Sequence, residues 1–375
     1  METVALLKAG EVDVPWTGRL MSLVGLFALM VIAWLCSTNR KKIHWRVVLW
    51  GASLQIGLGF LTLRTEVGQK FFLGMKDGVN KMLEFYKAGA DLVLGGIVTN
   101  RPFVFILEVL PTIIFFSSLM AVLYHLKIMQ RLVGAVAWVM RRTMRTSGAE
   151  SLSAAGNIFV GQTEAPLLIR PFLHKATRSE LMSVMTGGFA TVAGGVFVAY
   201  VFLLRDVFPD IAGHLMVASI MSAPAALLVA KLMYPEEEEP ETATAGAVSA
   251  ESPYVNVIDA ATTGAADGLK LSFNVAAMLL AFVALVAMLN YLFGVVGSGV
   301  DWVFNLDPTF ASITMEKALG WVLSPIAWIM GVPWVDCPAI GQLLGTKTVL
   351  NEWLAYDSLA KMMKAGAIKI GRAHV

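Results

Sequence analysis

The stretch of sequence that decides the fold is Gly156-Asn-Ile-Phe-Val-Gly-Gln-Thr-Glu-Ala-Pro-Leu-Leu-Ile-Arg-Pro171. It lies between long apolar segments, yet it holds four polar side chains: Asn157, Gln162, Thr163 and Glu164. Polar and charged groups at membrane depth are costly, so by default they indicate a functional site. Glycines and prolines also interrupt the stretch, and non-helical backbone inside a bilayer must line a cavity or be buried in protein. The pattern is typical of the broken helices with which transporters build substrate and ion sites.

The composition of the whole chain indicates a membrane protein. Of its 375 residues 57% are hydrophobic and only 15% are charged, and the mean hydropathy is +0.69. Soluble domains carry roughly a quarter charged residues, so we predict an integral, helical membrane protein embedded in the lipid bilayer. The formal net charge of +2 gives no sign of a nucleic-acid partner. The two cysteines, Cys36 and Cys337, lie in or beside apolar runs, and we interpret them as packing residues.

Apolar runs long enough to span a bilayer recur along the chain. In chain order they cover residues 18–37, 45–63, 102–126, 180–204, 209–233 and 268–294. Basic residues crowd the loop from Arg40 to Arg46 and the amphipathic segment 127–145. The positive-inside rule places both on the cytoplasmic side, which puts the N-terminus outside.

Residues 66–88 differ from the spans because their apolar residues are expected to form a single helical stripe. The stripe consists of Val67, Phe71, Met75, Val79 and Met82. We predict an interfacial amphipathic helix on the outer surface of the membrane.

Two interrupted regions occupy the two halves of the chain. Residues 149–179 contain no unbroken spanning run, and we predict a re-entrant hairpin that enters from the cytoplasm. Residues 312–346 repeat the pattern around Gly331-Val-Pro333 and Asp336-Cys-Pro338, and Asn351-Glu352 follows as a second polar group. An odd number of crossings separates the two regions, so they are inverted relative to each other, as in many secondary transporters. The predicted fold class is an all-α polytopic membrane protein of inverted repeats, with two re-entrant helical hairpins, broken helices and interfacial amphipathic helices.

The span at residues 180–204 has a centre rich in glycine and threonine. Two Gly-Gly pairs, at residues 187–188 and 194–195, lie there together with Thr186 and Thr191. Two interpretations stay open: the backbone is unwound at this point, or the small residues allow close helix packing.

The predicted organisation has six parts. Residues 1–145 form the scaffold-side spans and interfacial helices, and residues 146–233 form the first hairpin and the spans after it. Residues 234–265 are a hydrophilic, mobile cytoplasmic loop whose acidic run is solvated. Residues 266–311 are a long scaffold span and connector, and residues 312–369 are the second hairpin and the start of the next span. Residues 370–375 resemble a translated sequencing adapter, and we set them apart as a non-native tail.

The two glutamates, Glu164 and Glu352, are expected to face one cavity in the middle of the membrane. An ionised carboxylate in a low dielectric needs partners, which substrate hydroxyls and amides or a cation can supply. Helix-end carbonyls, Asn157 and the hydroxyl of Thr191 would hold a monovalent cation. A membrane-embedded enzyme with the two glutamates as acid and base is the other class. None of the five histidines lies mid-span, which speaks against it.

The two polar regions resemble the signature regions of the concentrative nucleoside transporter family. The resemblance lies in Gly161-Gln-Thr-Glu-Ala-Pro166 with the preceding Asn157, and in Lys347-Thr-Val-Leu-Asn-Glu-Trp-Leu-Ala-Tyr356. Leu110-Pro-Thr-Ile-Ile-Phe-Phe116 and Met330-Gly-Val-Pro333 also fit, and the likeness covers nearly the whole chain from residue 18. It implies cation-driven uptake of nucleosides by a homotrimer in the bacterial inner membrane, with an elevator-like movement of the transport domain. The coupling ion then takes the place of any cofactor.

The resemblance also implies roles for single residues. The substrate site would comprise Gln162, Thr163, Glu164 and Val196 on the side of the base, and Asn351 and Glu352 on the side of the ribose. Sodium would be held by Asn157, the carbonyl of Val160, Thr191 and the carbonyl of Val192.

Two further expectations follow from the family pattern. Thr191 stands where the family has a small hydroxyl residue, which favours sodium as the coupling ion. Proton-coupled symport of nucleosides or of another small polar metabolite is the alternative. The family continues past the second polar region with a span that carries Phe-Ala-Asn-Phe-x-Ser, and this sequence ends before it, so we expect a chain that lacks part of the ribose site.

Overall fold

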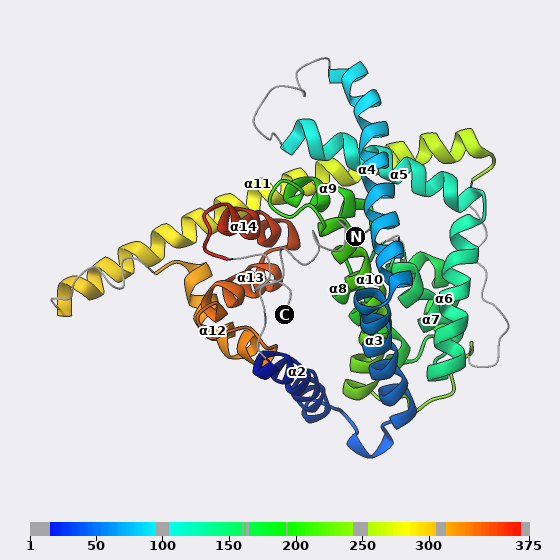
Figure 1. Cartoon of the computed structure of the whole chain (residues 1–375), viewed down its shortest axis with the longest axis horizontal. Helices are drawn as coiled ribbons and strands as arrows, with labels where there is room; N and C mark the ends of the chain where they lie inside the picture. Colours follow the sequence, from blue (N-terminus) through cyan, green and yellow to red (C-terminus); the bar gives the residue numbers. More distant parts are fainter. Residues whose placement is uncertain are drawn as a thin grey trace. The chain divides into compact units, whose positions relative to one another are not determined.

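The structure is a computed structural model that describes residues 16–94, 105–159, 161–162, 165–192, 194–242, 254–304 and 313–368. Every regular element in these ranges is a helix, which confirms the predicted all-α class. In chain order the elements are α2 (Trp16–Leu35), η1 (Arg40–Lys42), α3 (Trp45–Arg64), α4 (Glu66–Leu94), α5 (Phe105–His125), α6 (Ile128–Met144), α7 (Gly148–Asn157), η3 (Ala165–Lys175), α8 (Arg178–Ala190), α9 (Gly194–Leu204), α10 (Ile211–Met233), α11 (Val257–Phe304), α12 (Met315–Ile329), α13 (Cys337–Val349) and α14 (Glu352–Lys364) (Figure 1).

The chain divides into two compact units, which we describe separately. The C-terminal unit contains the described parts of Met1–Val31, Asp206–Phe208 and Asn274–Val375. The central unit contains those of Ile32–Arg205 and Pro209–Phe273. The first interrupted region therefore lies in the central unit and the second in the C-terminal unit.

Several helices have the length and apolar composition of membrane spans. Two qualify on their own, Ile211–Met233 and Val257–Gly299, and Leu20–Leu35 is a shorter apolar helix. Two further spans are possible if α3 with α4 and α5 with α6, each bent by 77°, are counted as single crossings. Bends of this size turn α4 and α6 away from the helix before them, as an interfacial helix requires.

The amphipathic helix predicted at residues 66–88 is present as α4, and its faces differ in exposure within the central unit. Phe72, Val79, Leu83 and Tyr86 are buried, whereas Val67 and Phe71 are exposed. Of the two faces, α4 packs the aromatic-rich one against the rest of the central unit, where Phe72 makes an edge-to-face contact with His214 of α10. Val67 and Phe71 of the predicted stripe are exposed, as an apolar stripe that faces lipid requires, whereas Val79 of the same stripe packs inside the unit.

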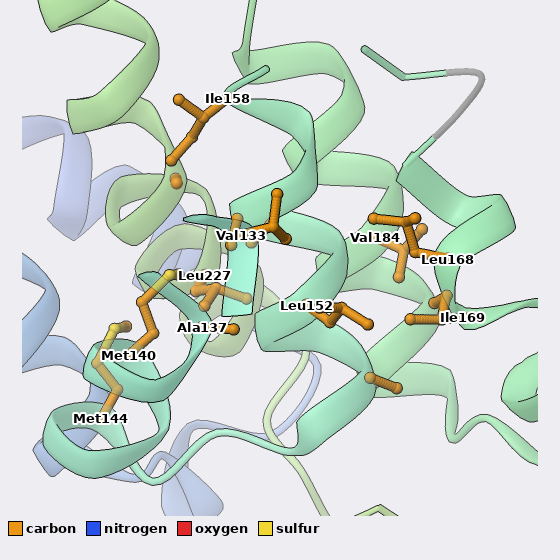
Figure 2. Packing of buried hydrophobic residues seen from close by; sticks show 14 of the residues in the cluster. Val133, Ala137, Met140, Met144, Leu152, Ile158, Leu168, Ile169, Val184 and Leu227 are labelled. Atoms are coloured by element: carbon orange, nitrogen blue, oxygen red, sulfur yellow. The ribbon is translucent and has the colours of Figure 1, made fainter. Parts of the chain in front are cut away.

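The core of the central unit surrounds the first hairpin. Figure 2 shows Val133, Ala137, Met140 and Met144 of α6 on one side of this core, with side chains of α7, η3, α8 and α10 around them. These four residues recur at helical spacing on α6. Its basic residues Arg141 and Arg142 lie in the last turn, where positive charges interact favourably with the helix dipole. The basic amphipathic segment predicted at 127–145 thus packs its apolar face against the first hairpin.

The first hairpin consists of two arms of different kinds. α7 is a ten-residue α-helix in which every residue is buried, and it starts at a capping box between Ser147 and Glu150. η3 is a 3₁₀ helix of eleven residues, longer than the three or four residues usual for this type. Pro166 and Pro171 lie in η3, and each lacks the N–H that an α-helical ladder needs. The hairpin agrees with the prediction, and the 3₁₀ arm was not foreseen.

The predicted span 180–204 is broken in the middle. α8 ends at Ala190, Thr191 takes an extended backbone conformation with φ −110° and ψ 150°, and α9 begins at Gly194. The unwound interpretation of this glycine-rich centre is therefore confirmed, and Gly187 and Gly188 also allow the close packing of the other interpretation.

The loop predicted at residues 234–265 is ordered at both of its described ends, so that prediction is wrong in part. α11 begins at Val257, inside the predicted loop. The acidic run is not simply solvated. Glu237 accepts hydrogen bonds from the Lys42 ammonium and the Asn39 amide, and Glu241 pairs with Lys175. Sequence alone does not reveal these partners, because the pairs are about 66 to 198 residues apart.

The C-terminal unit contains α12 and α13 as the second hairpin, as predicted. Glycines let the two helices approach closely: a Cβ added to Gly341 would lie 2.5 Å from the carbonyl oxygen of Gly320. Gly331, with φ 99°, makes the turn between the arms. Asn290 of α11 fixes the start of α12, because its amide donates to Glu316 and its oxygen accepts from the backbone N–H of Met315.

Candidate functional site

The tip of the first hairpin carries a buried amide without a hydrogen-bonding partner among the described residues. Asn157 is the last residue of α7, its exposure is 0%, and neither its Oδ1 nor its Nδ2 is bonded. Leaving buried polar atoms unpaired costs about 1–3 kcal/mol each. A ligand that engages this amide is the physical explanation that the local structure favours.

The end of α8 lies directly against this amide. A Cβ built on Gly187 would lie 3.1 Å from Asn157 Nδ2, tighter than most Cβ contacts, so the absence of a side chain favours this close approach. Thr191, which is buried, donates its hydroxyl hydrogen to the Gly187 carbonyl at 2.9 Å. This bond leaves the lone pairs of the Thr191 oxygen available, and half-buried Val192 follows in the break.

The electrostatics at this point favour a cation. Asn157 ends α7 and Thr191 caps α8, so the C-terminal ends of both helices meet here. Each C-terminal end carries about half a negative elementary charge from its unpaired carbonyls. Oxygen ligands from an amide, a hydroxyl and helix-end carbonyls match the way transporters coordinate Na⁺. The residues present therefore fit sodium, and the described part of the chain holds no group of three or more histidine, cysteine or acidic side chains that could bind a metal ion.

Gln162 lies beside the same helix end. A Cβ on Gly188 would sit 3.1 Å from the Cβ of Gln162, and Gln162 itself is exposed. Gly161, with φ 125°, gives the tip a conformation that other residues rarely adopt. The glycine pair at 187–188 thus accommodates Asn157 and Gln162 side by side. Val196 is half-buried in the first turn of α9.

Three predicted site residues lie outside the described residues: Val160, Thr163 and Glu164. Their roles, and the shared cavity expected for Glu164 and Glu352, stay predictions.

The second polar group lies at the start of α14. Asn351 is the N-cap, and its side-chain oxygen accepts from the backbone N–H of Leu354 at 2.9 Å. Glu352 is the first residue of α14, half-buried, with its carboxylate 3.5 Å from the ammonium of Lys347. A carboxylate is favoured at a helix N-terminus, so the start of α14 stabilises the Glu352 side chain in this position. The capping role of Asn351 was missed, although Asn directly before a helix is a recognisable signal.

Sequence reasoning also missed a buried ionic network at the other end of the first hairpin. It joins Lys231 of α10 to Glu150 of α7, and Glu236 pairs with the same lysine. A signal was available for part of it, because Ser147-Gly-Ala-Glu150 and Thr177-Arg-Ser-Glu180 both fit the capping-box pattern Ser/Thr-x-x-Glu.

These features define a class of protein: a helical membrane protein in which the tip of a hairpin packs against a broken helix. Three family models match the chain. They are the Na⁺ dependent nucleoside transporter N-terminus over residues 24–97, nucleoside recognition (Gate) over residues 106–206, and the Na⁺ dependent nucleoside transporter C-terminus over residues 214–374. The chain belongs to the Na⁺ dependent nucleoside transporter family. This is a family of transporters, so the enzyme hypothesis is set aside.

Curated relatives and solved structures agree with this assignment. Sodium/nucleoside cotransporter 1 from Mus musculus and from Homo sapiens are each 41% identical over 344 residues, which is 92% of this chain and 51% of each relative. Solute carrier family 28 member 3 from Rattus norvegicus is 41% identical over 346 residues, or 47% of its length. The chain thus spans about half the length of these relatives. CNTnw in an inward-facing substrate-bound state is 41% identical with a TM-score of 0.83, and the match covers 92% of this chain and 80% of that one.

Proposed function

We propose that the protein is a secondary active symporter that imports nucleosides, driven by the sodium gradient. The observation that carries the proposal is the convergence of two helix C-terminal ends on the unpaired amide of Asn157. Sodium would bind between Asn157, the hydroxyl of Thr191 and the carbonyls of Val160 and Val192. The names of the relatives, which are sodium/nucleoside cotransporters, support the same conclusion.

The nucleoside would bind next to the ion. Gln162 lies against Gly188, one residue from the glycine that contacts Asn157, so a ligand of its amide would lie close to the sodium. We assign Gln162, Thr163 and Glu164 to the base, with Val196 beside them, and Asn351 and Glu352 to the ribose. Sodium bound at the two helix ends fixes the hairpin tip against α8, and so it prepares the surface that the base meets. This order of events couples the two substrates.

Alternating access would move the site across the membrane. CNTnw has been solved in an inward-facing substrate-bound state, and variants of it in outward-facing and intermediate states. We propose the same type of cycle here, with an elevator-like movement, a homotrimeric assembly, and a bacterial inner membrane location with the N-terminus outside.

The test is nucleoside binding and uptake as a function of sodium at fixed pH and ionic strength. The chain in detergent is titrated with uridine and with adenosine, with choline replacing sodium, and uptake is measured in proteoliposomes with and without a sodium gradient. We expect binding to strengthen as sodium rises and uptake to follow the gradient. Binding that ignores sodium but follows pH would replace this proposal by proton coupling, and binding of neither nucleoside would overturn it.

A further inference from the structure

A buried ammonium group lies at the far ends of the two helices that form the candidate sodium site. Lys231 of α10 is 4% exposed. Its Nζ lies 2.7 Å from Glu150 Oε2, 2.9 Å from Ser179 Oγ and 3.1 Å from Glu236 Oε2. The ammonium donates hydrogen bonds to Ser179 and Glu236 and forms an ion pair with the Glu150 carboxylate.

The acceptors belong to different segments, so the ammonium joins them. Glu150 lies in the first turn of α7, and Ser179 lies in the first turn of α8. Glu236 belongs to the loop after α10, where it also accepts from the hydroxyl of Thr177, the N-cap of α8, at 2.9 Å. Lys231 therefore ties the start of α7 to the start of α8.

A second link runs directly between the same two helix starts. Ser147, the N-cap of α7, donates its hydroxyl hydrogen to Glu180 Oε1 at 2.6 Å. Glu180 completes the capping box of α8 by accepting from the backbone N–H of Thr177 at 3.0 Å. The Ser179 hydroxyl donates a hydrogen bond to the carbonyl of Tyr234 at 2.7 Å. The two capping boxes and the lysine thus form one continuous network.

The two helices run parallel from this network to the site. α7 has ten residues and α8 has thirteen, which correspond to about 15 and 20 Å at the usual rise per residue. At their C-terminal ends they meet again, where Gly187 adjoins Asn157 and Thr191 bonds to Gly187. A shift or rotation of α7 at its start therefore moves Asn157 relative to Thr191.

The packing of α7 does not fix its position by shape. Its sequence Gly-Ala-Glu-Ser-Leu-Ser-Ala-Ala-Gly-Asn contains one large apolar side chain, Leu152. A surface of small residues packs closely, but it has few large side chains to fix the position of the helix along its neighbours. Buried polar and ionic groups are known to specify register where apolar packing alone does not. The specific bonds of this helix lie at its start: Ser147 and Glu150 bond to the network, and the backbone N–H groups of Gly148 and Ala149 donate to Thr242.

We propose that Lys231 is a positioning residue for the sodium site: by joining the first turns of α7 and α8 it sets the distance between the Asn157 amide and the Thr191 hydroxyl at their other ends. The inference rests on the proposed function, because it assigns sodium to that site. Lys231 does not touch the ion. Lys231 acts by setting the positions of the two helices, so its loss should lower the affinity for sodium and leave the recognition of the nucleoside unchanged.

The test removes the ion pair without leaving a buried charge behind. The double variant Glu150→Gln/Lys231→Met replaces both charges, since Lys231→Met alone would strand the Glu150 carboxylate and is prone to misfold. Lys231→Arg keeps the charge and the donors. Lys175→Met is the matched control, because it breaks the exposed Lys175–Glu241 pair on the same loop at 2.7 Å and lies outside the buried network.

Each variant is purified in detergent, and uridine and adenosine binding is measured against sodium, together with the melting temperature. For the double variant we expect the half-saturating sodium concentration to rise about tenfold, a shift of one decade in affinity, while nucleoside affinity at saturating sodium is unchanged. The single variant Lys231→Arg should keep most of the wild-type sodium affinity, and Lys175→Met should bind sodium as the wild type does.

Two results would overturn the inference: unchanged sodium dependence in a folded double variant, or equal losses of sodium and nucleoside affinity together with a large drop in melting temperature. A wild-type protein that binds nucleosides without any dependence on sodium would instead remove the proposed function. The two failures are therefore distinguishable.

Discussion

The first hairpin, α7 with η3, and the second, α12 with α13, hold their arms in place by different means. All ten residues of α7 are buried, and its start is tied to α8 and α10 by charged and hydroxyl groups. α12 is buried only at Gly320, Ser324 and Ala327, and it packs on α13 through glycines. The first hairpin is thus positioned by its surroundings, whereas the second is held mainly by contacts between its own arms.

The difference matters for function because each hairpin precedes a different part of the proposed site. The first places Asn157 against the end of α8, and the second leads into Asn351 and Glu352. A site residue that depends on a network is displaced when any member of the network is lost. A site residue that depends on its own helix start, as Glu352 does, is sensitive mainly to local changes.

The largest expected effect tests the second of these sites. Glu352→Gln keeps the shape of the side chain and removes the charge that we assign to the ribose hydroxyls. We expect nucleoside affinity to fall about 100-fold or more, because a pocket built for specific hydrogen bonds discriminates strongly. Isothermal calorimetry at saturating sodium measures this. Asp357→Asn, which breaks an ion pair with Lys361 one turn further along α14, is the control and should bind normally. Wild-type affinity in Glu352→Gln would exclude this residue from the site.

The next effect contrasts the packing of the hairpins. Gly341→Ala places a Cβ 2.5 Å from a backbone oxygen of α12, while Gly156→Ala of α7 meets only the end of the Leu168 side chain, at 2.6 Å. We expect Gly341→Ala to destabilise by about 2 kcal/mol because the backbone must shift, and Gly156→Ala to cost less than about 1 kcal/mol since alanine also favours the helix.

Thermal unfolding in one detergent compares these two variants. Gly134→Ala on α6, where a Cβ meets nothing within 4 Å, serves as the reference for helix propensity alone. A larger loss for Gly156→Ala than for Gly341→Ala would contradict the contrast drawn between the two hairpins.

Asn157→Ala tests the ion site at the tip of the first hairpin. The variant removes one proposed ligand of sodium, so we expect the half-saturating sodium concentration to rise about tenfold or more, as for a lost hydrogen bond to a charged group. Nucleoside binding is measured against sodium at two pH values. Proton sensitivity should not change. Ser222→Ala, which truncates a part-buried hydroxyl of α10 that donates to the Ser219 carbonyl, is the control. An unaltered sodium requirement would remove Asn157 from the ion site.

The smallest effect concerns the loop that closes the base of the first hairpin. Hydrogen bonds from the Lys42 ammonium and the Asn39 amide hold the pKa of the Glu237 carboxyl below its usual value. A lowered pKa means that the stabilising contribution is complete above the ordinary glutamate pKa and is lost as the pH falls through the lower, folded value. We expect hydrogen exchange at residues 236–242 to quicken over that acidic range. In Lys42→Met exchange should be faster already at neutral pH, and an identical pH profile in both proteins would contradict this assignment.

Local signals in the sequence predicted most of the helical order. Glycines and prolines mark the turn at Gly331 and the break after Thr191, and apolar length marks α10 and α11. On α4, periodicity predicted the apolar stripe that contains Phe71 but did not indicate that the neighbouring Phe72 packs inside the unit. The 3₁₀ form of η3 depends on how two prolines are accommodated in a packed arm, which a residue pattern does not specify.

The candidate site was predictable in its residue types and not in its supports. Asn157 and Thr191 were identified because polar side chains are unusual among apolar runs. Lys231 and Glu150 are 81 positions apart in the sequence, and nothing in either local pattern says that the two charges meet. The close approach of Gly187 to Asn157 is likewise a property of the packed helices, visible only when both are placed.

The complete burial of α7 has a consequence for how the molecule opens. A helix with no residue facing solvent or lipid within its unit has no local route for its amide hydrogens to exchange with water. Exchange at α7 therefore requires the surrounding helices to separate. The exchange rates of these ten amides thus report the free energy of opening the whole central unit.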